Sequence, residues 1–368
     1  MTGTGDDRAA RLRLIRSANI GPVTYFQLLA RFGSADAALR AIPDLAARGG
    51  GRTPRIAPPA AIEAEMKAVE RLGARYLFKG QGLYPPLLAE LETAPPALVV
   101  KGRLSLLEMS PVAMVGARNA SAAACRFART LAHDLGGEGM AVVSGLARGI
   151  DTAAHDGAMA RGSETGGTIA VIAGGIDVFY PPENEARQRA IAEGGLLIAE
   201  QPPGVEPHAR HFPYRNRIIA GLSLGTIVVE AAPRSGSLIT ARYATEYGRD
   251  VMAVPGSPLD PRAQGCNGLI REGAILIQSA RDVVETIRPF SMRPVAAPLA
   301  DYQGAPVSPD ASEAERARVT GLLGPTPVSI DEIIRQAGLS PAVVQTVLLE
   351  LELGGRLERH AGGKVSLL

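Results

Sequence analysis

Three short apolar segments in the middle of the chain each end in a turn that contains glycine and arginine and that opens a helical segment. The segments and their turns are, in chain order, 112–115 with 116–121, 141–143 with 144–149, and 225–230 with 233–237. In an open parallel sheet such turns meet at the carboxyl edge, where ligands bind. Helix N-termini bind anions through backbone N–H groups, and the forked donors of arginine match phosphate oxygens. The three turns together therefore predict a ligand with several phosphates, or a polymer of them.

Apolar runs and helical segments alternate from residue 111 onward, which predicts an α/β fold. Strands are expected at 112–115, 140–143, 168–173, 196–199, 226–231, 251–254 and 274–277, and helices between them at 122–135, 152–160, 184–193, 214–221 and 237–247. Near-continuous apolar strands are typical of a parallel sheet covered on both faces. We therefore predict a Rossmann-like, doubly wound, mostly parallel sheet. The first turn lacks a G-x-G-x-x-G pattern, so no dinucleotide cofactor is expected.

The segments on either side of this sheet predict smaller domains. Residues 1–80 predict a small N-terminal helical domain of the SAM or helix-hairpin-helix type, followed by the extended Rossmann-like domain at 81–288. The glycine turn near Gly21 either lets a backbone N–H meet a DNA phosphate or simply caps a helix. Five prolines in 289–310 indicate a linker. Residues 311–368 have the helix, turn, helix and hairpin order of a winged-helix domain.

The second helix of this winged-helix segment is a poor candidate for reading DNA. The expected recognition helix, Pro341–Leu353, contains no lysine or arginine and carries Glu350 and Glu352 near its end. Phosphate contacts dominate DNA affinity, so an acidic helix argues against insertion into a groove and against a transcription factor. A protein-contact or regulatory role is preferred, although basic residues on the hairpin (Arg356, Arg359 and Lys364) argue for DNA contact.

Composition limits the other possibilities. The chain carries 39 Lys and Arg against 37 Asp and Glu, so a nucleic-acid site must be a local patch. Only Cys125 and Cys266 are present, without a metal-binding pattern, which fits a reducing compartment and no metal. The start is polar, and no apolar run approaches the ~20 residues that span a bilayer. These features predict a cytoplasmic protein without a membrane segment.

Six motifs, in order over most of residues 80–288, resemble those of the bacterial DNA-processing protein A family, also called DprA or Smf. They are VGARNAS (115–121), SGLARGIDTAAHDGAM (144–159), GGIDVFYPPEN (174–184), FPYRNRIIAGLS (212–223), RSGSLITARYATEYGRDVMAVPG (234–256) and GCNGLIREGA (265–274). The resemblance implies a homodimer that binds single-stranded DNA. It also implies that the protein protects incoming DNA during natural transformation and delivers the strand to the RecA recombinase.

The residues expected to hold DNA phosphates come from the three turns and from the Arg-Asn-Arg segment. They are Gly116, Arg118, Ser121, Ser144, Gly145, Arg148, Arg215, Arg217, Ser235, Gly236 and Ser237. Arg118 is the leading candidate, and pairing with a carboxylate such as Asp151 is its structural alternative. Arg148 has a salt bridge as its alternative. Arg215 and Arg217 are two residues apart on a helix, so one of them is expected to reach DNA while the other braces the fold.

Several neighbouring residues have both a structural and a functional interpretation. Ser237 can cap the following helix, and Asp151 is expected to cap the helix after the second turn. Phe179 either stacks on an unpaired base or belongs to the core. The loop Tyr180–Glu183 lacks the basic residue that follows Tyr-Pro in many relatives, so DNA contact there is in doubt unless Arg187 or Arg189 substitutes. His155 is expected to be a packed or capping residue.

No nucleophile, base and orienting group stand together in a recognisable pattern, so a binding protein is preferred to an enzyme. The alternative is an enzyme that cleaves nucleoside monophosphates, because 234–237 with Thr240 and Glu246 loosely resembles the phosphate loop and glutamate of nucleoside-monophosphate phosphoribohydrolases. In that interpretation Glu230 or Glu246 would act on the N-glycosidic bond.

Overall fold

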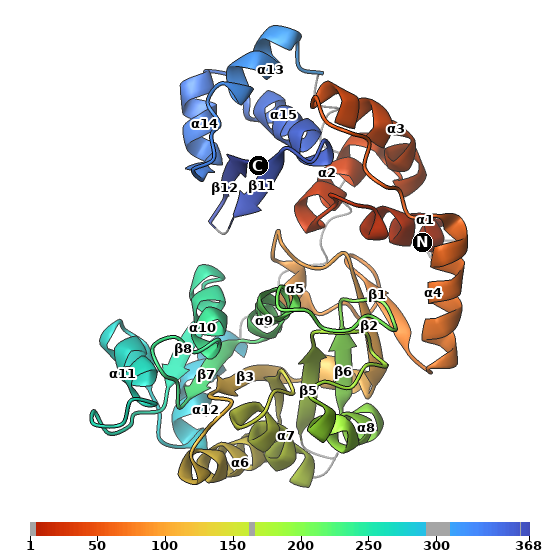
Figure 1. The fold of residues 1–368 in the computed structure, drawn as a ribbon. Helices are drawn as coiled ribbons and strands as arrows, with labels where there is room; N and C mark the ends of the chain where they lie inside the picture. Colours follow the sequence, from red (N-terminus) through yellow and green to blue (C-terminus); the bar gives the residue numbers. More distant parts are fainter. Residues whose placement is uncertain (1–4, 162–165, 292–309, 361) are drawn as a thin grey trace. The chain divides into compact units, whose positions relative to one another are not determined.

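The computed structural model describes residues 5–161, 166–291, 310–360 and 362–368. The chain forms two compact units (Figure 1). One unit is continuous and comprises Glu65–Ala296, and the other combines the two ends of the chain, Met1–Ala64 and Ala297–Leu368. Helix α4 (Pro59–Arg71) carries the chain from one unit to the other.

A nine-stranded sheet with the order β1-β2-β6-β5-β4-β3-β7-β8-β9 forms the centre of the continuous unit. The strands are β1 (Arg75–Phe78), β2 (Ala97–Gly102), β3 (Ser110–Gly116), β4 (Met140–Ser144), β5 (Gly167–Ile172), β6 (Leu196–Ala199), β7 (Gly225–Val229), β8 (Asp250–Ala253) and β9 (Ile275–Leu276). The strands β3 to β9 pair in parallel, whereas β2 is antiparallel to both β1 and β6. The predicted Rossmann-like, mostly parallel sheet is confirmed.

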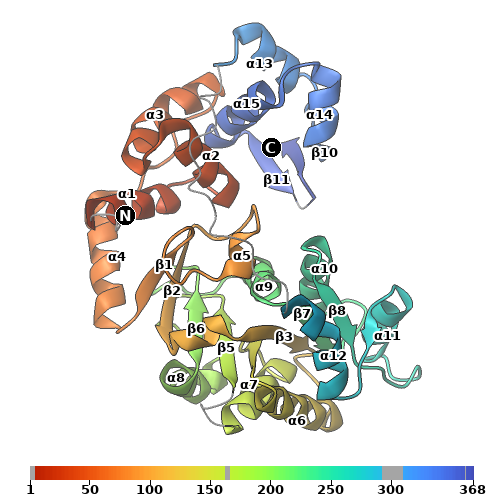
Figure 2. The ribbon, with the colours of Figure 1, turned by 180° about the vertical axis from the view of Figure 1, so that it is seen from behind.

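Helices cover both faces of the sheet, because alternate residues of each strand are apolar on both sides. Val112 and Met114 of β3 pack with α6 (Ala122–Gly137), α7 (Ile150–Ala160) and α12 (Ala280–Ser291). Ala113 and Val115 pack on the other face, with α5 (Pro86–Ala89), α9 (His211–Leu222), α10 (Ser237–Glu246) and α11 (Gln264–Arg271). Helix α8 (Glu185–Gly194) shares the face of α7 (Figures 1 and 2).

The order of the strands reverses between β3 and β7. The connection through α6 leads from β3 to β4 on one side, and the connection through α10 leads from β7 to β8 on the other. A crevice for ligands forms at such a point, outside the carboxyl ends of the strands. The first and third predicted turns follow these two strands, and the second follows β4 beside them.

The sheet is larger than the sequence predicts. It begins at Arg75 rather than after residue 80, and α5 and the buried strand β2 precede the first predicted strand. Both β1 and β2 lie outside the β/α alternation that identifies the parallel strands, which is why that pattern missed them. Helix α12 runs to Ser291, and 292–309 of the predicted linker lie outside the described residues.

The other unit joins the N-terminal helices to the winged-helix segment. It contains α1 (Gly5–Arg16), α2 (Pro22–Phe32), α3 (Ala35–Arg48), α13 (Glu313–Thr320), β10 (Val328–Ser329), α14 (Ile330–Ala337), α15 (Pro341–Leu353), β11 (Leu357–His360) and β12 (Lys364–Leu367). Leu349 and Leu353 of α15 belong to the core of the N-terminal helices. The two end segments, predicted as separate domains, therefore form one packed body.

Helix α15 is the closely packed centre of this second unit. Gly49 lies against the backbone of Glu350, where an added Cβ would be 2.1 Å from the carbonyl oxygen. Asn19, in the turn before α2, donates a hydrogen bond to the Leu353 carbonyl at 3.2 Å. Glu350 is fully buried and pairs with Arg316 at 2.8 Å. The expected recognition helix is thus covered by the protein's own N-terminal helices.

Candidate nucleic-acid interface

A pocket lies over the carboxyl ends of β3, β4 and β5, beside the start of α9. Its lining residues are Arg118, Gly145, Leu146, Ala147, Arg148, Ile172, Ala173, Gly174, Val178, Tyr180, Pro181, Phe212 and Arg215. The first and second predicted turns and the Arg-Asn-Arg helix each supply one arginine. Residues that are up to 97 positions apart in the sequence thereby form a single cationic pocket.

Arg215 is the buried arginine of this pocket, with only 7% of its surface exposed. Its Nη1 lies 3.8 Å from Oδ2 of Asp151, which is also buried. Burial lowers the pKa of Arg215 to about 10, so the guanidinium remains charged at neutral pH. The guanidinium occupies the space beside Gly145, where a Cβ would come within 1.1 Å of Nη1. Glycine at position 145 therefore makes room for Arg215.

Arg118 is exposed and lies over the ring of Phe212, with its Cζ 5.3 Å from the ring centroid. This cation–π contact holds the guanidinium at the pocket while leaving it open to solvent. The ring of Tyr180 packs against Phe212 at 5.6 Å and is 47% exposed. Phe179 is partly buried, lies outside the pocket lining and is covered by Arg189, whose Cζ is 4.5 Å from its ring centroid. Tyr180 is thus the more open of the two neighbouring aromatic rings.

The turn after β4 satisfies its own backbone. The N–H groups of Gly145 and Ala147 donate to Oδ2 of Asp151, at 3.1 and 3.3 Å. The N–H of Leu146 donates to Nε2 of His155 at 3.2 Å. The expectation that Asp151 caps helix α7 is wrong, because Gly149 is the capping residue and the carboxylate is directed back into the turn. The side chain of Arg148, rather than these N–H groups, is the donor that this turn directs to the pocket.

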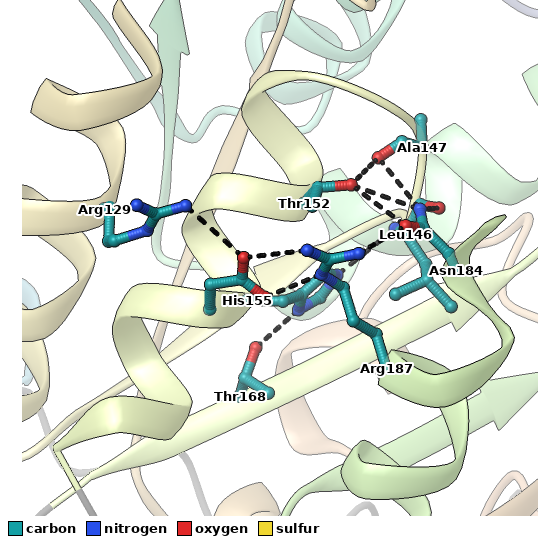
Figure 3. Close-up of polar contacts among 9 residues, drawn as sticks. Arg129, Leu146, Ala147, Thr152, His155, Thr168, Asn184 and Arg187 are labelled. Carbon is teal, nitrogen blue, oxygen red and sulfur yellow. Dashed lines mark hydrogen bonds and ion pairs between the residues drawn. The ribbon is translucent and has the colours of Figure 1, made fainter. Parts of the chain in front are cut away.

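Side chains of α7 and of the segment just before α8 hold the carbonyl groups of the same turn, as Figure 3 shows. Asn184 Nδ2 donates to the Leu146 carbonyl at 2.9 Å, and Thr152 Oγ1 donates to the Ala147 carbonyl at 2.7 Å. Arg187 binds Asn184 at 3.1 Å and Asp156 at 2.7 Å. Sequence reasoning missed this supporting network, although Asn184 ends one of the motifs that carry the family resemblance.

His155 is a buried packing residue, as expected. Since Nε2 accepts a hydrogen bond from Leu146, the ring proton lies on Nδ1, which donates to Thr168 Oγ1 at 2.7 Å (Figure 3). Thr168 in turn donates to the Val142 carbonyl. Burial lowers the pKa of His155 to about 3, so the ring is neutral under all but strongly acidic conditions.

Three other predicted residues lie in or near the first two turns but outside the pocket lining. Gly116 packs against β7, where a Cβ would be 2.0 Å from the Val229 carbonyl oxygen. Ser121 caps α6 by accepting a hydrogen bond from the N–H of Ala124. Ser144 is fully buried and donates to the Met114 carbonyl at 2.6 Å. These contacts shape the edge of the sheet.

The third turn also lies outside the pocket lining. The hydroxyl groups of Ser235 and Ser237 are 2.7 Å apart, and Gly236 between them is exposed. Gly236 occupies the capping position of α10, so the possibility that Ser237 is the cap is wrong, and Ser237 is the first helical residue. The turn remains open to a ligand through Gly236.

Arg217 is directed away from the pocket into a structural ion pair. Its guanidinium binds the Glu200 carboxylate at 2.5 Å and the Thr93 carbonyl. Arg215 and Arg217 thus lie on different sides of α9, and Arg215 is the one that lines the pocket.

Neither Glu230 nor Glu246, the two alternative catalytic residues of the enzyme interpretation, lines the pocket. Glu230 accepts from the N–H of Ser121 at 2.7 Å and pairs with Arg262 at 3.2 Å. Glu246 is exposed at the far end of α10, about 14 Å from Ser237 by the rise of an α-helix. Among the residues that the structure describes, no group of three or more His, Cys, Asp or Glu could hold a metal ion, and no helix could cross a membrane.

Comparison with known proteins places this arrangement in a family. Residues 75–288 match the description "DNA recombination-mediator protein A", 5–68 match a "DprA-like N-terminal HHH domain" and 303–363 match a "DprA winged helix domain". Protein Smf of Escherichia coli is 36% identical over 315 residues, which cover 84% of this chain and 82% of that protein. DNA processing protein DprA of Streptococcus pneumoniae is 50% identical over 201 residues, 55% of this chain and 70% of that protein.

Two solved structures share the fold. The X-ray structure of DprA from Streptococcus pneumoniae has a TM-score of 0.64 and 37% identity, covering 78% of this chain and 99% of that chain. The structure of DNA processing protein A from Helicobacter pylori, described for its single-stranded DNA binding mode, has a TM-score of 0.53 and 28% identity, covering 59% of this chain and 96% of that chain. With all three sequence matches in order along the chain, this protein belongs to the DNA recombination-mediator protein A family, DprA/Smf.

Proposed function

We propose that this protein binds single-stranded DNA at the pocket above β3, β4 and β5. The observation that carries the proposal is the convergence of Arg118, Arg148 and Arg215, from three separate elements, beside the exposed ring of Tyr180. The Helicobacter pylori relative, which is described for single-stranded DNA binding, supports the choice of ligand.

In this proposal the three arginines hold phosphates, and an aromatic ring stacks on an unpaired base. Tyr180 is better placed for stacking than Phe179, because Arg189 covers the ring of Phe179. Stacking tolerates every base, so sequence preference should be weak. Phosphate contacts release counterions, so affinity should fall steeply with salt. The turn at Ser235, Gly236 and Ser237, which is exposed at Gly236, would extend the phosphate track beyond the pocket.

The family resemblance extends the proposal to the cellular role. We propose that the protein is a cytoplasmic homodimer that protects incoming DNA during natural transformation and loads the RecA recombinase onto it. A dimer would join two pockets on one strand and raise the overall affinity through effective concentration.

We further propose that the protein is not an enzyme. The positions of Glu230 and Glu246 support this, since the first is bonded to Ser121 and Arg262 and the second lies at the far end of α10. We also propose a protein-contact or regulatory role for the winged helix, because α15 is buried against the protein's own helices.

Fluorescence anisotropy with labelled single-stranded and double-stranded oligonucleotides, at two salt concentrations, tests the binding proposal. Tight, salt-sensitive preference for the single strand should be strongly reduced in Arg118→Ala. The matched control is Arg281→Ala, which removes an exposed arginine from α12, outside the pocket. Equal binding of both strands, or wild-type affinity of Arg118→Ala, would refute the site. Release of free base from a nucleoside monophosphate would favour the enzyme instead.

A further inference from the structure

We propose that Glu183 is a built-in competitor of DNA phosphate for Arg148, and that it sets the affinity and salt dependence of the pocket. This inference rests on the proposed function, because the competing anion is the backbone of single-stranded DNA. It assigns a role to a residue that the family resemblance leaves unexplained.

The contact that carries this inference lies at the rim of the pocket. The carboxylate Oε1 of Glu183 is 2.5 Å from Nη2 of Arg148. Glu183 lies on the short 3-10 helix η2 (Pro182–Asn184), and Arg148 lies on the turn after β4, which η2 holds through Asn184. The carboxylate therefore occupies a position that a phosphate oxygen would take on Arg148.

The charges of the pocket explain why this carboxylate matters. Three arginines line the pocket, and two carboxylates pair with them: Asp151 with Arg215, and Glu183 with Arg148. Asp151 is buried and accepts two backbone hydrogen bonds, so it cannot leave without opening the turn. Glu183 is the exchangeable partner, because 52% of its side chain and 62% of that of Arg148 are exposed.

Replacement of Glu183 by a DNA phosphate on Arg148 costs little free energy, for two reasons. The pKa of Glu183 is lowered, first by its own backbone N–H and also by Arg148, so the carboxylate is charged at neutral pH. Exposed ion pairs are weak, whereas an arginine fork binds two phosphate oxygens at once. A DNA phosphate can therefore displace Glu183, and part of the binding free energy is used in doing so. The displaced carboxylate also lowers the net counterion release at this arginine.

Anisotropy titrations of the full-length protein with a fluorescent oligothymidylate, over a salt series, test this inference. Glu183→Gln should bind about two- to fivefold tighter than wild type, the range expected for an exposed ion pair. Its salt slope should be steeper by about 0.7, the value for one phosphate on a single strand. The matched control, Glu185→Gln, removes the same charge two residues away, where Glu185 pairs with Arg189 at 2.7 Å outside the pocket.

A double-mutant cycle separates competition from a general change of charge. In an Arg148→Ala background, Glu183→Gln should have no more effect than Glu185→Gln. If wild type binds the strand and Glu183→Gln behaves as Glu185→Gln does in both backgrounds, the inference is overturned while the proposed function stands. If neither wild type nor Glu183→Gln binds the strand, the proposed function fails and the inference fails with it.

Discussion

Replacing Gly145 by alanine should weaken DNA binding although no charged residue is replaced. The added Cβ would lie 1.1 Å from Nη1 of Arg215, whereas ordinary contacts begin at 3.4 Å. The guanidinium must then move by about 2.3 Å or more, since the backbone of the turn is held by Asp151, His155 and Asn184. Arg215 would leave the position from which it lines the pocket.

The expected loss of DNA affinity is that of one charged hydrogen bond between Arg215 and a phosphate. Such a bond contributes about 1.5–3 kcal/mol, which corresponds to a roughly 10- to 150-fold weaker affinity. The salt slope should fall by about 0.7, because one phosphate contact is lost. Movement of Arg215 also leaves the buried carboxylate of Asp151 without its partner, which should lower the free energy of unfolding by about 3–5 kcal/mol.

The assay is a double-mutant cycle by fluorescence anisotropy, with thermal unfolding of each variant to choose a temperature at which all are folded. Gly145→Ala should weaken binding in the wild-type background and have no further effect in Arg215→Ala, where no guanidinium remains to be displaced. Wild-type affinity of Gly145→Ala, or an equal loss in both backgrounds, would refute the reasoning.

Three further predictions concern stability. Burial lowers the pKa of His155 to about 3 in the folded protein, whereas an unperturbed histidine has a pKa of about 6.5. Because the unfolded chain therefore takes up this proton first, the free energy of unfolding should fall by about 1.4 kcal/mol per pH unit from pH 6.5 toward 3. His155→Gln, which retains an acceptor for the N–H of Leu146, should remove this contribution in denaturant titrations. Gly49→Ala should destabilise the terminal unit by about 1–3 kcal/mol through overpacking against Glu350, as measured by calorimetry. Arg217→Met should lower the free energy of unfolding by about 3 kcal/mol while leaving the DNA affinity of the folded protein unchanged.

A control variant or a specific outcome would contradict each of these three predictions. Persistence of the acid slope in His155→Gln would assign it to other groups. Gly324→Ala, in the same unit with no atom within 4 Å of the added Cβ, should be nearly neutral, and equal losses at both glycines would exclude overpacking. A large loss of DNA affinity in folded Arg217→Met would place that arginine in the DNA site.

The family of the protein and the centre of its fold were predictable from the sequence. Strands β3 to β9 lie in apolar runs or follow from the alternation of strand and helix. These signals can be seen in the neighbouring sequence, without knowledge of distant residues. The turns after β3 and β4 could be placed for the same reason, since glycine and a capping serine mark them. The antiparallel strands β1 and β2 could not, because β2 pairs with β6, about 100 positions away, and β1 joins the sheet only through β2.

The selection among candidate site residues required tertiary structure. The sequence shows two arginines on α9, but only the packed structure shows that Arg217 meets Glu200 and that Arg215 lies beside Gly145. A glycine turn shows N–H groups that suit an anion, but their use by Asp151 and His155 depends on how α7 packs.

The winged helix also separates what the sequence predicts from what only the tertiary structure shows. The absence of basic residues from Pro341–Leu353 argues from sequence alone against reading a DNA groove. Its burial against α3, at the other end of the chain, follows from apolar faces that have no sequence signal for their partner. Local sequence thus determined the parallel strands, the turns after them and the family, because backbone preferences and motifs are short-range. Packing decided which charged and polar groups remain free for a ligand, because burial and pairing depend on residues brought together from distant parts of the chain.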